Sequence, residues 1–148
     1  MFKEMFTLSW NAGRLNRLRY LWLVVASFAL WIGALFIYLV VLSLAGINIE
    51  TSASFGGIAL PILPFYFLLL WVQLCLSVKR FQDLNLSGLW ALAVLGISLL
   101  ANYFLQMGEG FYALSLGLYI ITVLAAVALL CWPGTEGENN FGEDPRYL

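Results

Sequence analysis

The segment Lys79-Arg80-Phe81-Gln82-Asp83-Leu84-Asn85-Leu86-Ser87-Gly88-Leu89-Trp90 is a strongly polar interruption in the middle of a very apolar chain. Two cations and one carboxylate lie within its first five residues, and Ser87 is a residue type that commonly begins a helix. Long runs without a charged residue, 51–78 and 84–108, lie on either side. The segment therefore joins two apolar halves of the chain.

The overall composition is that of a membrane protein. The chain has 148 residues, of which 63% are hydrophobic and 10% charged, and its mean hydropathy is +0.93. A soluble domain carries about 25% charged residues, so this chain has too few polar groups to cover a surface that faces only water. Its length predicts a single domain, 1–148. The net charge of −1 gives no support for nucleic-acid binding.

Four apolar stretches are long enough to cross a bilayer. About 20 helical residues span a hydrocarbon core of about 30 Å. The sequence predicts spans at residues 20–44, 57–78, 88–106 and 111–132, followed by a glycine- and acid-rich tail at 133–148. The first apolar run is too long for the hydrophobic region of a cleaved signal peptide. Pro61 and Pro64 lie in the first turns of the second span, where proline can begin a helix.

The charges predict an orientation. Cations gather before the first span and between the second and third, whereas Glu50 and Glu109 occupy the other two connections. The positive-inside rule then places both termini and segment 79–87 in the cytoplasm. Spans without the alternating pattern of an outer-membrane barrel must be helical in lipid. We therefore expect an all-α membrane protein, an antiparallel four-helix transmembrane bundle of multi-pass topology in the bacterial inner membrane.

Three motifs lie at the predicted cytoplasmic ends of these spans. Residues 13–20 are similar to the pattern G-R-x-x-R-x-x-Y, residues 79–90 to R-R-x-H-D-x-x-x-S-G-x-W, and residues 133–145 to P-G-T-x-G-x-N-x-F-G-x-D-P. Together they resemble domain-of-unknown-function family 805, the YhaH-like bacterial inner-membrane proteins. The resemblance covers nearly the whole chain and implies a location and a topology, but no reaction.

The chain departs from the family pattern at three positions. Gln82 stands where the family usually has histidine, Arg19 where an acidic or amide residue is common, and Leu21 where tryptophan is usual. The chain contains no histidine at all, which removes imidazole acid–base chemistry and the common histidine-containing metal sites. We therefore predict no catalytic residue, no cofactor and no metal.

The three motifs define a candidate cytoplasmic face, either functional or only architectural. Arg80 and Asp83 are neighbours on a helical turn, and Ser87 is placed to cap the third helix. We expect a basic rim of arginines and Lys79 that contacts anionic lipid headgroups, with the acidic tail folded back on it and Phe141 as an apolar anchor. The candidate residues are Arg14, Arg17, Arg80, Asp83, Ser87, Gly88, Trp90, Asn139, Phe141 and Gly142.

Polar and small residues inside the spans predict helix contacts. Gln73, Asn102 and Gln106 are expected to bridge helices, as amides in membrane helices usually do. Small residues allow close packing, either within the chain or in a dimer: Gly96, Gly117, Ala125 and Ala126. The middle of each predicted span carries no ionisable residue, so the usual marker of a proton relay or charged-substrate carrier is missing.

The sequence favours a non-enzymatic accessory or interaction protein, whose partners are the bilayer and either a second copy or another membrane protein. The alternative is an oligomeric channel or transport component, which would need several copies to form a pore. A membrane enzyme is the third hypothesis. Asp83 with Arg80 and the acidic tail are its candidate groups, and no nucleophile–base pair accompanies them.

Overall fold

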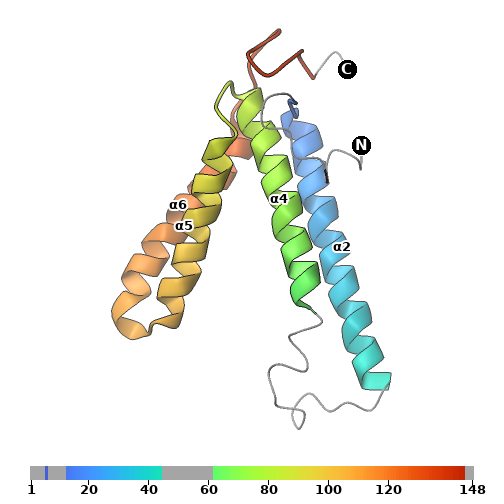
Figure 1. Ribbon diagram of the computed structural model, residues 1–148, viewed down its shortest axis with the longest axis vertical. Coiled ribbons are helices and arrows are strands. Elements are labelled where there is room, and N and C mark those ends of the chain that lie inside the picture. Colours follow the sequence, from blue (N-terminus) through green and yellow to red (C-terminus); the bar gives the residue numbers. More distant parts are fainter. Residues whose placement is uncertain (1–5, 7–12, 45–61, 146–148) are drawn as a thin grey trace.

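The computed structural model describes residue 6, residues 13–44 and residues 62–145, and over these ranges the fold is built from helices. The long helices are α2 (Arg17–Leu44), α4 (Leu63–Asp83), α5 (Leu89–Gln106) and α6 (Tyr112–Cys131), shown in Figure 1. A single 3-10 turn, η1 (Glu109–Phe111), precedes α6. Each long helix is apolar and long enough to cross a membrane, as predicted.

Some expectations fall outside the described residues. These are the position of Pro61 and the connection that carries Glu50. Pro64 does lie in the first turn of α4, where its missing N–H costs no helical hydrogen bond.

Helix α4 is longer at its carboxyl end than the sequence indicated. The charged residues Lys79, Arg80 and Asp83 belong to its last turns and not to the connecting loop. The loop shrinks to residues 84–88, where Asn85 adopts a left-handed conformation with φ of 59°. The Ser87 Oγ accepts from the Leu89 N–H at 3.3 Å and so satisfies a donor at the start of α5, but the cap residue of this helix is Gly88 and not the predicted Ser87.

The helices pack most closely at one end. Helix α2 lies beside α4 and α5 beside α6, and the two pairs diverge from the end where α4 passes into α5 (Figure 1). The buried apolar cluster is concentrated on residues near that end, including Leu15, Leu23, Leu76, Ala91 and Leu129. The two helix pairs are therefore held together mainly at one end, whereas the predicted bundle implied packing along the length of the helices.

Away from that end, large apolar side chains cover the helix surfaces. Phe36 on α2 is 67% exposed, and Leu124 on α6 is 62% exposed. Soluble proteins rarely expose contiguous apolar surface on this scale. These surfaces suit contact with lipid.

Inside the spans, two hydrogen bonds between helices involve serine hydroxyl groups. The Gln73 amide of α4 donates to the Ser27 Oγ of α2 at 2.7 Å, as predicted for Gln73. The Ser115 Oγ of α6 donates to the Ala101 carbonyl of α5 at 2.9 Å, a contact the sequence did not single out. The prediction for Asn102 is wrong, because its amide donates to the Ser98 carbonyl within α5.

The small residues also differ from expectation. A Cβ added at Gly96 or at Gly117 would meet no other atom within 4 Å, so neither glycine is needed for close packing within the chain. A dimer contact through these positions stays a prediction.

We expect the Gln73–Ser27 hydrogen bond to couple α2 and α4 energetically. Gln73→Ala and Ser27→Ala, singly and together, should show a coupling energy of about 0.6–1.7 kcal/mol in a double-mutant cycle of unfolding in detergent. Asn102→Ala is the control, since its hydrogen bond stays within one helix. Additive effects of the two substitutions would show that the contact contributes nothing to helix association.

Candidate functional site

Arg80 occupies the centre of a polar network at the closely packed end. Its side chain is fully buried in the last turn of α4. Nε donates to the Leu129 carbonyl at 2.7 Å, and Nη2 donates to the Trp132 carbonyl. Nη1 donates to Asp83 and lies 3.4 Å from the Leu15 carbonyl.

These contacts have a clear physical reason. The last carbonyls of a helix lack intrahelical partners, and the Leu129 carbonyl belongs to the final turn of α6. A cation at this position is also favoured by the negative end of the helix dipole. One guanidinium therefore joins the end of α4, the end of α6 and the chain that leads into α2.

Asp83 lies between two arginines. One carboxylate oxygen accepts from Arg14 Nε at 3.1 Å and the other accepts from Arg80, which forms the predicted pair one turn apart. All three side chains are almost entirely excluded from solvent. Removing charges from water is costly unless each is paired and hydrogen-bonded, so the two cations need more acceptors than Asp83 alone provides.

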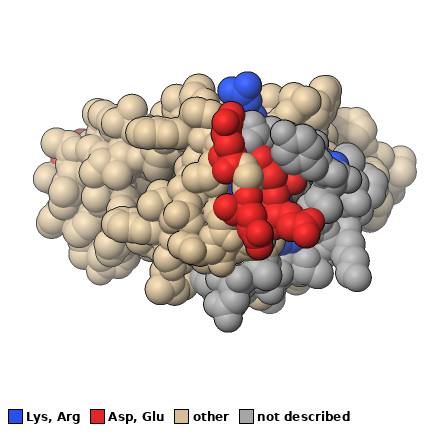
Figure 2. All heavy atoms as spheres, turned by 90° about the horizontal axis from the view of Figure 1, so that it is seen from above, with Lys and Arg blue, Asp and Glu red and all other residues tan. Residues whose placement is uncertain are grey.

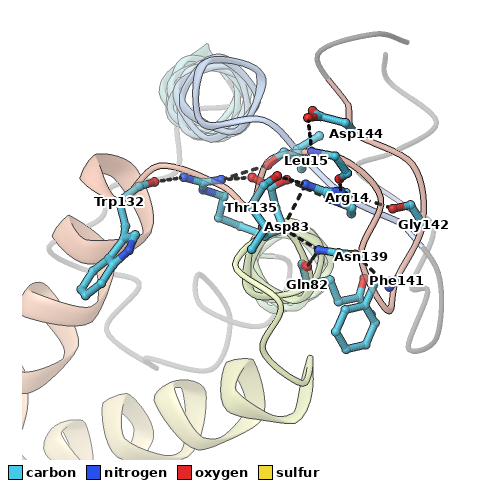
Figure 3. A network of polar contacts seen from close by, with 12 residues as sticks. Arg14, Leu15, Gln82, Asp83, Trp132, Thr135, Asn139, Phe141, Gly142 and Asp144 are labelled. Carbon is cyan, nitrogen blue, oxygen red and sulfur yellow. Dashed lines mark hydrogen bonds and ion pairs between the residues drawn. The ribbon is translucent and has the colours of Figure 1, made fainter.

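The tail provides those acceptors to Arg14. Arg14 Nη2 donates to the Thr135 carbonyl, and Nη1 donates to the carbonyls of Gly137 and Gly142. The Gly13 N–H donates to the Phe141 carbonyl at 3.0 Å. The tail thus folds back as predicted, but the contacts to Arg14 come from backbone carbonyls and not from the expected acidic side chains (Figure 3).

Thr135 and Asn139 bind the tail to the end of α4. The N–H and the hydroxyl of Thr135 both donate to the Asp83 carbonyl, at 2.9 and 3.0 Å. The Asn139 amide donates to the Gln82 carbonyl at 2.9 Å and to Thr135 Oγ1 at 2.8 Å. Carbonyls at the end of α4 are therefore satisfied by a segment more than fifty positions later in the chain.

The tail holds its own shape through a compact turn. Asp144 Oδ2 accepts from the Gly137 N–H at 3.0 Å, and Asn139 Oδ1 accepts from the Phe141 N–H at 2.8 Å. Gly137 has φ of +75° and Gly142 has φ of +129°, conformations that side chains rarely tolerate. The contacts that Phe141 makes in this network come from its backbone, and the side chain is half-buried.

The structure brings together only part of the predicted face. Arg14, Arg80, Asp83, Asn139, Phe141 and Gly142 meet in the network. Gly88 is buried in the loop before α5, the Ser87 Oγ accepts from the Leu89 N–H of that helix, and Trp90 is 57% exposed on it. Sequence reasoning missed Thr135 and Gly134, although both lie within the tail motif, and it missed the carbonyls of Leu15, Leu129 and Trp132.

The expected basic rim is wrong for three of its members, because the Arg14 side chain is only 1% exposed and two residues of α4 are buried as well. Arg80 is fully buried and Lys79 is only 5% exposed. Among the described residues, the arginines exposed at this end are Arg17 and Arg19, on the first turn of α2. Figure 2 shows that acidic side chains gather on the end face instead. All residues from 78 to 83 are buried, because the end of α6, the tail and Arg14 surround the last turns of α4.

A small pocket adjoins the network. Its volume is about 160 Å³, and Asp83, Thr135 and Arg17 are among the residues that line it. Within residues 13–44 and 62–145, no three cysteine, aspartate or glutamate side chains converge as a metal site would require. The hydrogen-bonding groups of Arg14 and Arg80 are directed to carbonyls and to Asp83. This arrangement is suited to holding three chain segments together.

Gly134 provides a direct test of this packing. A Cβ built there would overlap the Asp83 carboxylate. Gly134→Ala should therefore displace the tail from Asp83 and lower the free energy of unfolding in detergent by about 1–3 kcal/mol, as overpacking does. Gly110→Ala is the matched control, because a Cβ there meets no atom within 4 Å. Equal stability of the two variants would contradict the close contact.

Comparisons with known proteins show to which proteins this chain is similar. The chain matches the family model described as protein of unknown function (DUF805) over residues 8–143. It is similar to the uncharacterized protein YiiR of Escherichia coli K12, with 32% identity over 127 residues that cover 81% of this chain and 80% of YiiR. YiiR of Escherichia coli O157:H7 matches to the same extent. No solved structure matches the chain.

Proposed function

This chain belongs to the DUF805 family, and from that membership we propose that it is a small integral inner-membrane protein that acts through a partner and not as an enzyme. The observation that carries the proposal is the network of Arg14, Asp83 and Arg80, which joins three distant segments into one surface at one end of the helices. Such a surface suits an accessory protein that binds another membrane protein or a second copy of itself.

The orientation belongs to the same proposal. The four helices cross the membrane in alternating directions, with both termini and residues 79–90 in the cytoplasm. Arg17 and Arg19 are exposed at the end that carries the network, and Glu109 lies on η1 at the connection between α5 and α6. This distribution of cations supports a cytoplasmic network end under the positive-inside rule.

The environment of Asp83 supports a non-enzymatic role. The carboxylate is held by two arginines, is 2% exposed and is covered by Gly134. A general acid or base must reach its substrate within hydrogen-bonding distance, directly or through one water. Asp83 instead serves as the shared acceptor that positions Arg14 and Arg80. The exposed acids of the tail, Glu138 and Glu143, are then available to a partner.

Cysteine labelling tests the orientation. In a chain whose Cys75 and Cys131 are replaced by alanine, Glu109→Cys should react with an impermeant maleimide added outside the inner membrane. Glu138→Cys should react only after the membrane is opened. Both positions are exposed in the structure. The reverse pattern, or a chain absent from the membrane fraction, would overturn the proposal.

Cross-linking tests the accessory role. A photo-cross-linker at position 138 should give a specific adduct with another membrane protein, whereas one at position 109 should not. The adduct should disappear in Arg14→Gln, because Arg14 holds the tail in place. Adducts that contain only copies of this chain in a closed ring would favour the oligomeric channel instead.

A further inference from the structure

A second pocket lies between the start of α2 and the end of α6. Its volume is about 380 Å³, and it is lined by Arg17, Leu18, Leu21 and Leu130. The first three residues lie on the first turns of α2 and the fourth on the last turn of α6. Residues 17, 18 and 21 share one side of α2, since positions three and four apart are neighbours on a helix. Arg17 is thus the one charged residue that lines an otherwise apolar pocket.

Arg17 stands at the boundary between two environments. It lines this apolar pocket and also the polar pocket beside Asp83. Asp83 is already paired with Arg14 and Arg80, so these two cations offset its negative charge. Glu136 and Asp144 line the polar pocket, and repulsion from their carboxylates disfavours an anion there relative to the apolar pocket.

We propose that an anionic glycerophospholipid binds here, with its phosphate at Arg17 and an acyl chain along the three leucines. The inference rests on the membrane placement proposed above and adds a site to it. An arginine can bind a phosphate through two parallel hydrogen bonds, and an acyl chain would cover the apolar surface that Leu18, 59% exposed, leaves open. A cation close to the end of a membrane span lies at the level of lipid headgroups.

Native mass spectrometry of the full chain in detergent tests the site. Phosphatidylglycerol and phosphatidylcholine with the same acyl chains are added at equal concentration. We expect adducts mainly with phosphatidylglycerol, reduced about fivefold in Arg17→Gln, the size expected for one cation at a lipid headgroup. Arg19→Gln is the matched control, because Arg19 carries the same charge, is exposed on the same turn and does not line the pocket.

A second pair of variants tests the acyl part. Leu18→Ser should reduce adducts of both lipids, whereas Leu89→Ser, at a residue of similar exposure that does not line the pocket, should not. Equal binding of the two lipids by the wild-type chain, or equal losses in Arg17→Gln and Arg19→Gln, would overturn the proposed site. If the cysteine labelling succeeds while these results fail, only the lipid site is wrong. A chain absent from the membrane fraction would overturn the proposed function as well.

Discussion

Arg80→Leu is expected to lower the free energy of unfolding by about 3–5 kcal/mol, the loss typical when one partner of a buried charge network is removed. The substitution leaves the carbonyls of Leu129 and Trp132 without their donor and removes one of the two cations beside Asp83. The end of α6 should then separate from α4, since Arg80 links the two helices directly.

Unfolding of the purified protein in detergent measures this effect. Arg19→Leu is the control, because it removes the same charge from an exposed position on α2, and its stability should match that of the wild type. Arg80→Lys should fall between the two, since an ammonium group cannot reproduce the directions of the guanidinium donors. An Arg80→Leu variant as stable as Arg19→Leu would show that the network does not hold the helices together.

Arg14→Gln is expected to release the tail. Arg14 donates to the carbonyls of Thr135, Gly137 and Gly142. A hydrogen bond from a charged group contributes about 1.5–3 kcal/mol, so losing even one should raise the population of the released tail roughly tenfold or more. Cleavage of a transiently opened segment follows that population when opening is fast.

A protease that cuts after glutamate reports the release, because Glu136, Glu138 and Glu143 lie in the tail. The rate of cleavage should rise about tenfold or more in Arg14→Gln, by the same free-energy argument. Arg19→Gln should be cut at the wild-type rate, since it removes the same charge from an exposed residue that does not line the pocket beside the tail. Equal cleavage of the two variants would contradict the role of Arg14 in docking the tail.

Several features of the site could be predicted from particular residues. The spacing of Arg80 and Asp83 predicted their ion pair, and the position of Ser87 predicted its contact with the start of α5. The acidic residues of the tail, expected to face a basic rim, predicted a segment that folds back, which it does, although backbone carbonyls and not those acids contact Arg14. Asn139, which binds the tail to α4, was among the predicted residues. The contacts of Arg14 could not be predicted, because backbone carbonyls such as those of Thr135 and Gly137 are present at every residue and leave no signature in the sequence.

The sequence by itself determined the four apolar helices. Their hydrophobic runs are long enough to span a bilayer, and in lipid a helix satisfies the hydrogen bonds of its own backbone. Tertiary structure alone decided the role of residues 79–83. Their charges suggested an exposed basic loop, yet α4 continues through them and turns Lys79, Arg80 and Asp83 inward. That arrangement is stable because Arg14, the end of α6 and the tail supply the partners of the buried charges from distant parts of the chain.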